Sequence, residues 1–374
     1  MQGNHQTARI ITRRDFLKLS ALGALATLVP TQPARALQEN SHPTSVQHLV
    51  PANLGNQVQD KSTFARDLRQ GRVIADNIII YDTPSSQGNK VGIYWKDNIL
   101  TISAITYSED SEQSFNPIWY KIGEEGYAHS GFIQPVDTII NAPVDQIPPS
   151  GLLAEVSVPF TDAFWKPGFD QLVAHRYYFE TTYWVFGIVY DAQNNPWYAT
   201  LDDKWDLIYY VPATHLRIFS NEELSTISPD VPLKLKRIEI NLAEQILTAY
   251  ELDKPVFMAR VATGARFRSG SYMTPPGHYI TFHKRPSRHM ARGNLAANGY
   301  DLPGVPWNAY ITESGIALHG TYWHNNFGRP RSHGCINLTP QAARWIYRWT
   351  IPEVPPREQR VYENYGTAVD ILEE

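Results

Sequence analysis

Short apolar runs separated by turn residues begin at about Gly71, and this texture is typical of the strands of a small all-β module. The runs cover residues 73–75, 78–81, 91–95, 99–102, 119–122 and 126–128. Residues 37–70 are polar and have no clear period, so we predict a linker there. Over 71–136 we expect about five strands that close into a small barrel.

A second copy of this pattern follows a proline-rich stretch over 137–150, which we predict to be a linker. In the first copy Trp119-Tyr120 leads through a loop to a Tyr-Ala pair and an apolar strand, and Trp197-Tyr198 begins a similar arrangement in the second. We therefore predict a diverged internal repeat, with the second module over 151–219. The first copy resembles a bacterial SH3-like domain, and the second resembles a more divergent one.

Two interpretations of these modules remain open. SH3-like modules in exported proteins often bind cell-wall polymers, so wall binding is one possibility that the resemblance implies. The other is that the aromatic residues form the barrel cores and that the modules only space the last domain from the wall.

Alternating apolar and polar residues return after a second linker, predicted over 220–233, and mark a third region over 234–374. Ile238, Ile240 and Leu242 alternate with polar residues, as expected of a half-buried strand. Further strands are expected over 245–250, 256–261, 278–282 and 366–371. This third region is therefore predicted to be mostly β.

One helix and one long loop are predicted within the third region. Thr339 followed by Pro340 is typical of a helix N-cap and first helical position, and Pro352 limits the helix at its other end. Ala342, Trp345, Ile346 and Trp349 recur at helical spacing, so they predict the buried face. Residues 284–307 have no clear period and are expected to form a long irregular loop, such as a lid.

The N-terminus is typical of an export signal. Arg13-Arg14 is followed by Phe16-Leu17-Lys18, a mild apolar run over 19–29 and the small residues of Ala34-Arg35-Ala36. This pattern resembles a twin-arginine signal peptide over 1–36. The apolar run is shorter than the ~20 residues that a membrane-spanning helix needs, so we expect no membrane span in the mature protein and an extracytoplasmic location, in the cell wall or periplasm.

Composition excludes some classes of function and leaves others open. The formal net charge is −4 and the sequence has no long basic run, so binding to nucleic acid is not expected. The chain has a single cysteine, Cys335, which excludes an intramolecular disulfide and a multi-cysteine metal site.

Cys335 lies in the run Ser332-His333-Gly334-Cys335, with His319-Gly320 upstream. A thiol reacts as its thiolate, and a neighbouring imidazole can take the proton, so this set of residues is typical of a nucleophile for acyl transfer. A zinc site built from His319, His324, His333 and Cys335 and an inert buried cysteine are two weaker alternatives.

The motif residues carry a close resemblance to a known family. The run from His319 to His324, then Phe327-Gly328, then the run from Ser332 to Asn337, is similar to the signature of the L,D-transpeptidase catalytic (YkuD) family. The resemblance covers about residues 234–374. It implies a β-sandwich-like catalytic domain with a short helix after the nucleophile, preceded here by two small SH3-like barrels, so the chain is expected to be mainly β.

The resemblance also implies catalytic roles. Cys335 would be the nucleophile and His319 the general base, oriented by the backbone carbonyl of Gly320. His333 and Gly334, with the Cys335 backbone, would form the oxyanion hole and shape the site. No metal and no cofactor is expected.

The substrate-binding residues are expected to be Ser332, Asn337, Tyr322, Arg331 and Trp307. Ser332 and Asn337 would hold the motif loop or contact the substrate. Arg331 would pair with stem-peptide carboxylates, because guanidinium groups suit them. Trp307 would belong to an aromatic lid, unless these residues only pack the long loop closed.

The lid and the positive charges near the motif extend this set. The other lid candidates are Tyr300, Leu302, Pro303, Val305 and Pro306. Arg285, Arg288 and Arg329 are further candidates for carboxylate binding, although surface charge is the expected role of at least two of the four arginines.

The reaction that the family implies is peptidoglycan 3→3 cross-linking. The Cys335 thiolate would attack a tetrapeptide stem, release terminal D-Ala and leave a thioester, which the amine of a neighbouring stem resolves. Water in place of the amine would give an L,D-carboxypeptidase or another cell-wall thiol peptidase with the same acyl-enzyme. A third hypothesis is a non-catalytic wall-binding protein whose last domain is a relic.

Overall fold

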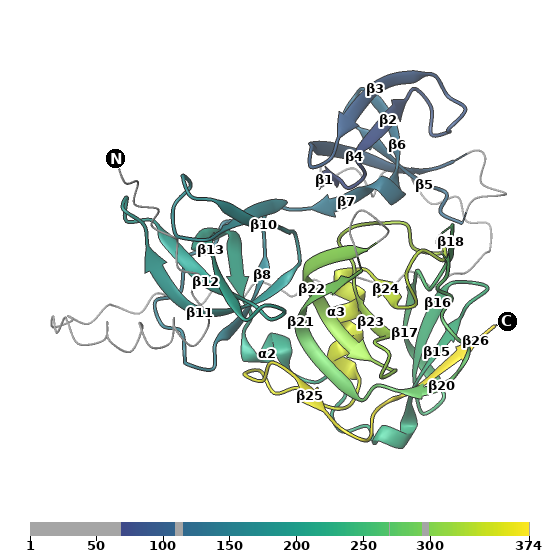
Figure 1. The fold of residues 1–374 in the computed structure, drawn as a ribbon. Coiled ribbons are helices and arrows are strands. Elements are labelled where there is room, and N and C mark those ends of the chain that lie inside the picture. The colour runs from purple at the N-terminus through teal and green to yellow at the C-terminus, as the bar shows by residue number, and fades with distance from the viewer. Residues whose placement is uncertain (1–68, 109–114, 269, 294–298, 374) are drawn as a thin grey trace, which may run out of the picture.

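The computed structural model describes residues 69–108, 115–268, 270–293 and 299–373. The predicted signal peptide and nearly all of the first linker lie outside the described residues. The chain is mainly β with few helices, which confirms the predicted fold class. Figure 1 shows the strands gathered into separate groups along the chain.

The first module, defined here as residues 69–136, is a seven-stranded sheet. Its strands are β1 (Arg69–Val73), β2 (Asn77–Tyr81), β3 (Lys90–Trp95), β4 (Ile99–Tyr107), β5 (Ile118–Ile122), β6 (Gly126–His129) and β7 (Ile133–Val136). The buried side chains of Ile80, Ile102 and Ile133 form part of its own core. A single turn of 3-10 helix over Ser130–Phe132 precedes the last strand.

The second module, defined as residues 152–218, has the same number of strands. They are β8 (Leu152–Val156), β9 (Phe160–Phe164), β10 (Val173–Tyr178), β11 (Thr182–Tyr190), β12 (Pro196–Asp202), β13 (Leu207–Pro212) and β14 (Leu216–Ile218). A 3-10 turn over Ala213–His215 precedes β14.

The two modules share one topology. The strand order is β3-β2-β6-β5-β4-β1-β7 in the first and β10-β9-β13-β12-β11-β8-β14 in the second, so each strand of one module has its counterpart seven strands later in the other. Trp119 and Trp197 occupy equivalent strands, β5 and β12, and both are buried. The predicted internal repeat is therefore confirmed at the level of strand order.

The C-terminal domain contains two five-stranded sheets. One has the order β17-β16-β15-β26-β20, with β15 (Lys236–Asn241), β16 (Ile246–Glu251), β17 (Lys254–Arg260), β20 (Gly277–Ile280) and β26 (Ala368–Leu372). The other has the order β24-β23-β22-β21-β25, with β21 (His283–Arg292), β22 (Tyr300–Tyr310), β23 (Ala317–Gly320), β24 (Ile336–Leu338) and β25 (Val361–Tyr362). A two-stranded ribbon joins β18 (Arg266–Phe267) to β19 (Gly270–Ser271).

Helices are short and few among the described residues. The principal one is α3 (Pro340–Trp349), whose N-cap Thr339 accepts a hydrogen bond from the Ala342 N–H, as the sequence predicted. It packs against β22 and β23 (Figure 1). Its buried residues include Ile346 and Trp349, whereas Trp345 is only half-buried. The remaining helices are α2 (Asn221–Leu224) and a 3-10 turn over Leu233–Leu235.

The expectation of a long irregular loop over 284–307 is wrong. Residues on both sides of the segment 294–298 form the antiparallel strands β21 and β22, with pairs from His283↔Tyr310 to Arg292↔Tyr300. The sequence showed no two-residue period because polar side chains on this hairpin are buried against other elements instead of facing water. Arg285 and His289 bind carboxylates of the second module, and Lys284 is buried within the C-terminal domain.

The second module and the C-terminal domain share one hydrophobic core. Trp184 and Trp197 of the module belong to the same cluster of buried residues as Ile238, Trp307 and Ile346. A buried hydrogen bond joins the two parts as well, since Thr182 Oγ1 donates to the Pro286 carbonyl at 2.7 Å. No helix in the described part of the chain is long and apolar enough to cross a membrane.

Candidate active site

Two neighbouring strands bring the cysteine and histidine motifs together. Cys335 directly precedes β24, which pairs in parallel with β23, so that His319 lies opposite Asn337. The two motifs, separate in sequence, therefore lie side by side at one edge of the sheet. Cys335 and His319 line the same cavity, which has a volume of about 560 Å³.

The His319 ring has a fixed orientation. It is 2% exposed, and its Nδ1 donates a hydrogen bond to the Gly320 carbonyl at 2.9 Å. Because a carbonyl only accepts, the neutral ring carries its proton on Nδ1 and leaves Nε2 as the acceptor. This is the contact that the family resemblance implied for Gly320. Burial lowers the pKa of His319 to about 4.

The Cys335 thiol is protonated in the resting site. Burial raises the pKa of Cys335 to about 11, which outweighs the opposite effect of the Ala317 backbone N–H. Its Sγ donates to the Gly315 carbonyl at 3.6 Å. Together with the lowered pKa of His319, this makes the resting pair a neutral thiol and a neutral imidazole.

Hydrogen bonds fix the loop that precedes Cys335. Ser332 Oγ donates to the Cys335 carbonyl and accepts from the Gly334 N–H at 3.1 Å. Thr274 Oγ1 donates to the Gly334 carbonyl at 2.9 Å. Gly334 has a φ of +112°, a backbone conformation that residues other than glycine rarely adopt. In this state the Gly334 N–H is already engaged, so its predicted oxyanion role requires Ser332 to release it.

The His333 side chain is held by aromatic rings. It stacks on Phe267 with ring centroids 4.8 Å apart and meets Tyr272 edge-on at 4.6 Å. Its pKa is lowered, first by burial and then by the positive charge of Arg292. His333 therefore shapes the wall of the cavity as a neutral ring, in keeping with a site-shaping role.

Asn337 and His324 lie behind the motif. Asn337 Nδ2 is 2.9 Å from His324 Nε2, and the Asn326 N–H donates to His324 Nδ1 at 3.3 Å. Burial lowers the pKa of His324 well below its ordinary value, so this ring is also neutral. Asn337 lines the cavity while its amide contacts His324, an arrangement that suits holding the loop.

Two residues predicted to bind substrate lie elsewhere. Trp307 is 2% exposed and packs between Phe219 and Tyr347, with ring centroids 5.2 and 5.3 Å away. Tyr322 is 3% exposed, and its hydroxyl donates to the Pro303 carbonyl at 3.1 Å. Neither lines the cavity that contains Cys335. These two predictions are wrong, because the rings face the core and the domain interface instead.

Some of the predicted lid does reach the site. Tyr300 and Leu302 line the cavity, together with Met290 and Trp323, which the sequence analysis did not single out. Val305 is fully buried. Only the first residues of β22 therefore border the cavity, while the rest of the strand belongs to the core.

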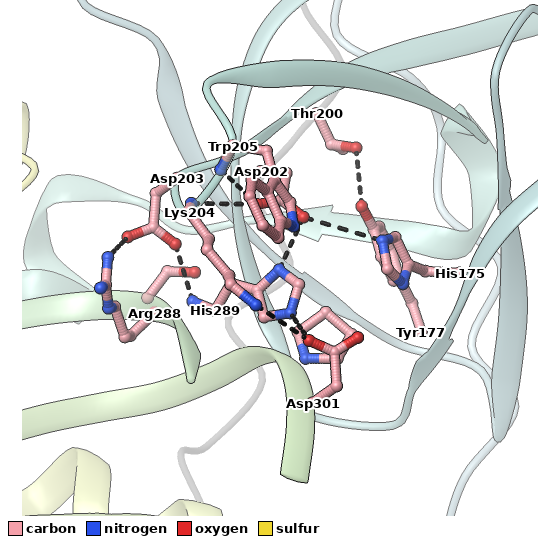
Figure 2. A network of polar contacts seen from close by, with 12 residues as sticks. His175, Tyr177, Thr200, Asp202, Asp203, Lys204, Trp205, Arg288, His289 and Asp301 are labelled. Atoms are coloured by element: carbon pink, nitrogen blue, oxygen red, sulfur yellow. Dashed lines mark hydrogen bonds and ion pairs between the residues drawn. The ribbon is translucent and has the colours of Figure 1, made fainter. Parts of the chain in front are cut away.

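The four arginines near the motif divide into two pairs. Arg285 and Arg288 both bind Asp203 of the second module, at 2.5 and 2.6 Å, so they join the two parts of the molecule (Figure 2 shows Arg288). Arg329 and Arg331 line the cavity. Arg266 lines it too and was missed, because it lies on the β18–β19 ribbon far from the motif in sequence.

The described residues do not form the zinc site that the sequence left open as an alternative. Within the described residues, no three His, Cys, Asp or Glu side chains come close enough together to hold a metal ion. His324 is engaged with Asn326 and Asn337, and the His319 Nδ1 with Gly320, as described above.

Comparison with known proteins identifies a family that the C-terminal domain resembles. Residues 235–371 match the model of the YkuD family, described as the L,D-transpeptidase catalytic domain. Residues 235–371, which contain the Cys335 motif, thus correspond to an L,D-transpeptidase catalytic domain, as the resemblance predicted. No curated protein matches the chain.

Solved structures with some likeness include three L,D-transpeptidases. A C442S mutant of the Enterococcus faecium enzyme is 20% identical, with a TM-score of 0.28 over 37% of this chain and 49% of that one. The Stackebrandtia nassauensis protein is 22% identical, with a TM-score of 0.26 over 41% and 60%. The Mycobacterium smegmatis protein is 15% identical, with a TM-score of 0.30 over 51% and 90%. This chain spans about half the length of the Enterococcus faecium protein.

Proposed function

We propose that the protein is a peptidoglycan L,D-transpeptidase that forms 3→3 cross-links through a thioester on Cys335. The observation that supports this most is the shared cavity of Cys335 and His319 within a domain that matches the L,D-transpeptidase catalytic family. The Nδ1–Gly320 bond leaves His319 Nε2 as an acceptor, which a general base requires.

The first half-reaction acylates the cysteine. His319 Nε2 takes the thiol proton as the sulfur attacks the carbonyl carbon at the L-centre of the third stem residue. The C–S bond forms and a tetrahedral oxyanion develops, which backbone N–H groups of the His333–Cys335 segment stabilise. The C–N bond to terminal D-Ala then breaks, and the imidazolium returns the proton to the leaving amine.

The second half-reaction transfers the acyl group. The amine of a neighbouring stem attacks the thioester, His319 takes its proton, and the new amide forms as the C–S bond breaks. The proton returns to the sulfur and restores the neutral pair. Neither half-reaction changes an oxidation state, so the chain's own groups suffice for the chemistry.

The rest of the chain supports an extracytoplasmic role. We infer export by the twin-arginine route from Arg13-Arg14 and the apolar run that follows. The SH3-like assignment of the two modules remains part of this proposal, and with it wall binding. In the first module, Trp119, His129 and Phe132 line a cavity of about 340 Å³, which a wall polymer could use.

A product assay tests the function. The mature protein is incubated with a disaccharide-tetrapeptide, and released D-Ala and stem dimers are measured by liquid chromatography and mass spectrometry. We expect both products from the wild type, and a loss of more than about 10³-fold in the Cys335→Ala variant.

The distribution of products decides between the two acceptors. D-Ala release without a dimer, even with added amine acceptor, would assign the protein as an L,D-carboxypeptidase. A folded protein that releases no D-Ala from any tetrapeptide contradicts both assignments.

A further inference from the structure

Arg72 of β1 carries a charged side chain that is almost completely buried. It is 1% exposed, and it forms an ion pair with Asp97 of the same module at 2.8 Å. It also donates two hydrogen bonds to Gln134 Oε1, at 3.2 and 2.8 Å. Burying a guanidinium group is costly unless the group is paired and hydrogen-bonded. These contacts within the first module therefore fix the position of the guanidinium group.

Further contacts of Arg72 reach both other parts of the molecule. Its guanidinium carbon lies 4.0 Å from the centroid of the Tyr178 ring in the second module. Its Nη2 donates to the Tyr322 carbonyl of the C-terminal domain at 2.9 Å, three residues after His319. The Tyr178 and Tyr322 rings stack on each other, with centroids 5.3 Å apart. Arg72 thus contacts all three parts of the molecule at one junction.

Tyr322 connects Arg72 to the active site through its neighbour in the chain. The Trp323 ring meets the Tyr322 ring edge-on at 5.0 Å, and it packs against the His319 ring with centroids 5.8 Å apart. Trp323 also lines the cavity that contains Cys335. Because Trp323 directly follows the carbonyl that Arg72 holds, a shift of that carbonyl would move the ring that packs on His319. A misplacement of about 1 Å in an active site can lower the rate by about 10²-fold.

The first module holds the same loop, residues 321–328, at a second point. Asn325 Nδ2 donates to the carbonyls of Ser130 and Ile133, at 3.3 and 3.0 Å. The Asn325 backbone N–H donates to the Gly131 carbonyl at 3.3 Å. The loop is therefore anchored to one module on both sides of the indole ring that packs on the imidazole.

We propose that Arg72 is a positioning residue for the reaction at the active site. By holding the Tyr322 carbonyl, it keeps Trp323 packed against the His319 general base. The first module then contributes to the rate of acyl transfer itself, in addition to any contact with the cell wall. This inference rests on the proposed function, because it concerns the rate of the reaction that the active site performs.

Two variants of Arg72 and one matched control separate positioning from stability. Arg72→Met keeps a long side chain but removes every donor, whereas Arg72→Lys keeps the positive charge beside Asp97 and loses the planar guanidinium group. Arg176→Gln is the control, since Arg176 binds the other oxygen of Asp97 at 3.1 Å and Asp162 at 2.8 Å. Its hydrogen bonds go to these two carboxylates, so this variant weakens the same junction without removing a donor to the Tyr322 carbonyl.

Steady-state release of D-Ala from a disaccharide-tetrapeptide gives kcat and KM for each variant of the full mature chain. Denaturant unfolding first identifies a temperature at which all variants are folded, so that a loss of stability alone does not lower kcat. We expect kcat to fall by about tenfold or more in Arg72→Met, with KM within about threefold, because the general base is misplaced. In kcat, Arg72→Lys should lie between Arg72→Met and the wild type, and Arg176→Gln should stay within about twofold of the wild type.

Backbone hydrogen exchange measures the loop without any substrate. Mass spectrometry of peptides that cover residues 321–328 should show faster exchange in Arg72→Met than in the wild type, because the loop loses one anchor. Exchange should be unchanged in Arg176→Gln. An unchanged kcat in folded Arg72→Met and Arg72→Lys overturns the inference. An equal fall in kcat in Arg176→Gln overturns it too, since the loss would then come from the loosened junction and not from the Tyr322 contact.

Exchange and turnover together separate this inference from the proposed function. If exchange over residues 321–328 rises in Arg72→Met but the wild type releases no D-Ala, Arg72 holds the loop and the proposed activity fails. If the wild type releases D-Ala and Arg72→Met does so with the same kcat, the proposed activity stands and the positioning role fails.

Discussion

At the scale of single residues, the resting site contains a thiol that is a weaker acid than usual and an imidazole that is a weaker base than usual. Burial raises the pKa of Cys335 to about 11 and lowers the pKa of His319 to about 4. Neither group therefore carries a charge at neutral pH in the empty site. Proton transfer then has to accompany attack on the substrate, so the nucleophile forms only when a carbonyl is in place.

This protonation state predicts the pH dependence of thiol alkylation. Below a pKa of about 11, the thiolate fraction rises tenfold per pH unit, and His319 stays neutral above about pH 4. We therefore expect the rate of iodoacetamide alkylation to rise about tenfold per unit from pH 6 to 9. Mass spectrometry reports it directly, because Cys335 is the chain's only cysteine.

A plateau in the alkylation rate across pH 6 to 8 would contradict the neutral pair and would indicate an imidazolium–thiolate pair instead. The His319→Gln variant is the control for the role of the imidazole. Its profile should have the same slope, because the raised pKa of Cys335 comes from burial and not from His319.

Sequence reasoning at this scale succeeded where neighbours in the chain are neighbours in space. Cys335, Ser332 and Asn337 lie within one motif, and all three line the cavity. The prediction failed for Trp307, because an aromatic residue in a polar segment is equally consistent with a lid residue and with a core residue. It missed Arg266, whose position beside the motif depends on pairing between β18 and β19.

At the scale of elements, the β21–β22 hairpin connects the C-terminal domain to the second module. His289 of β21 lies between two carboxylates, with Nδ1 2.7 Å from Asp202 and Nε2 2.8 Å from Asp301 (Figure 2). Its backbone N–H donates to Asp203 at 2.7 Å. Burial lowers the pKa of His289, but the bonds and charges of Asp202 and then Asp301 outweigh it and raise the pKa.

This network predicts a pH-dependent contribution to stability. A raised pKa for His289 means that its contribution is fully present below the ordinary value of 6.5 and is lost as pH rises through the folded-state value. Asp202 and Asp301 have pKa values lowered by their bonds to His289, against the effect of burial, so both stay charged across the pH range in which His289 titrates. Lys204, His175 and Arg288 are the other charged or titratable groups nearby.

We expect the His289→Gln substitution to destabilise the protein by about 2 kcal/mol at pH 5.5, and by clearly less at pH 9. Denaturant unfolding at the two pH values measures the difference. His278→Gln is the matched control, because His278 also binds a carboxylate, Asp370, but its side chain is 90% exposed. Equal losses at both pH values for His289→Gln would contradict a charged His289.

The hairpin also shows why β21 could not be predicted as a strand from its sequence. A strand buried on both faces has no two-residue alternation, and here the buried groups include charged residues such as Lys284, whose Nζ donates to the Thr350 and Pro352 carbonyls. A charged segment without two-residue alternation is normally predicted to be a loop. The strand can be recognised only when the carboxylates and carbonyls that bind these charges, which belong to other elements, are known. By contrast, α3 could be predicted because Thr339 and Pro340 act locally.

At the scale of the whole molecule, the first module contacts the loop that follows His319. Asn325 Nδ2 donates to the carbonyls of Ser130 and Ile133, and Arg72 donates to the Tyr322 carbonyl at 2.9 Å. The same loop carries Trp323 and His324 to the cavity. The repeat could be predicted from sequence, but this docking could not, because it depends on polar groups far apart in the chain.

The most direct test of the central claim is the intact mass of the mature protein during reaction with a disaccharide-tetrapeptide. We expect a transient adduct equal to the donor minus D-Ala, located on Cys335 by peptide mapping. The adduct should be absent from Cys335→Ala, and reduced by about 10²-fold or more in formation rate in His319→Gln. Product formation by a folded Cys335→Ala variant, or an adduct on another residue, would contradict a thioester on Cys335.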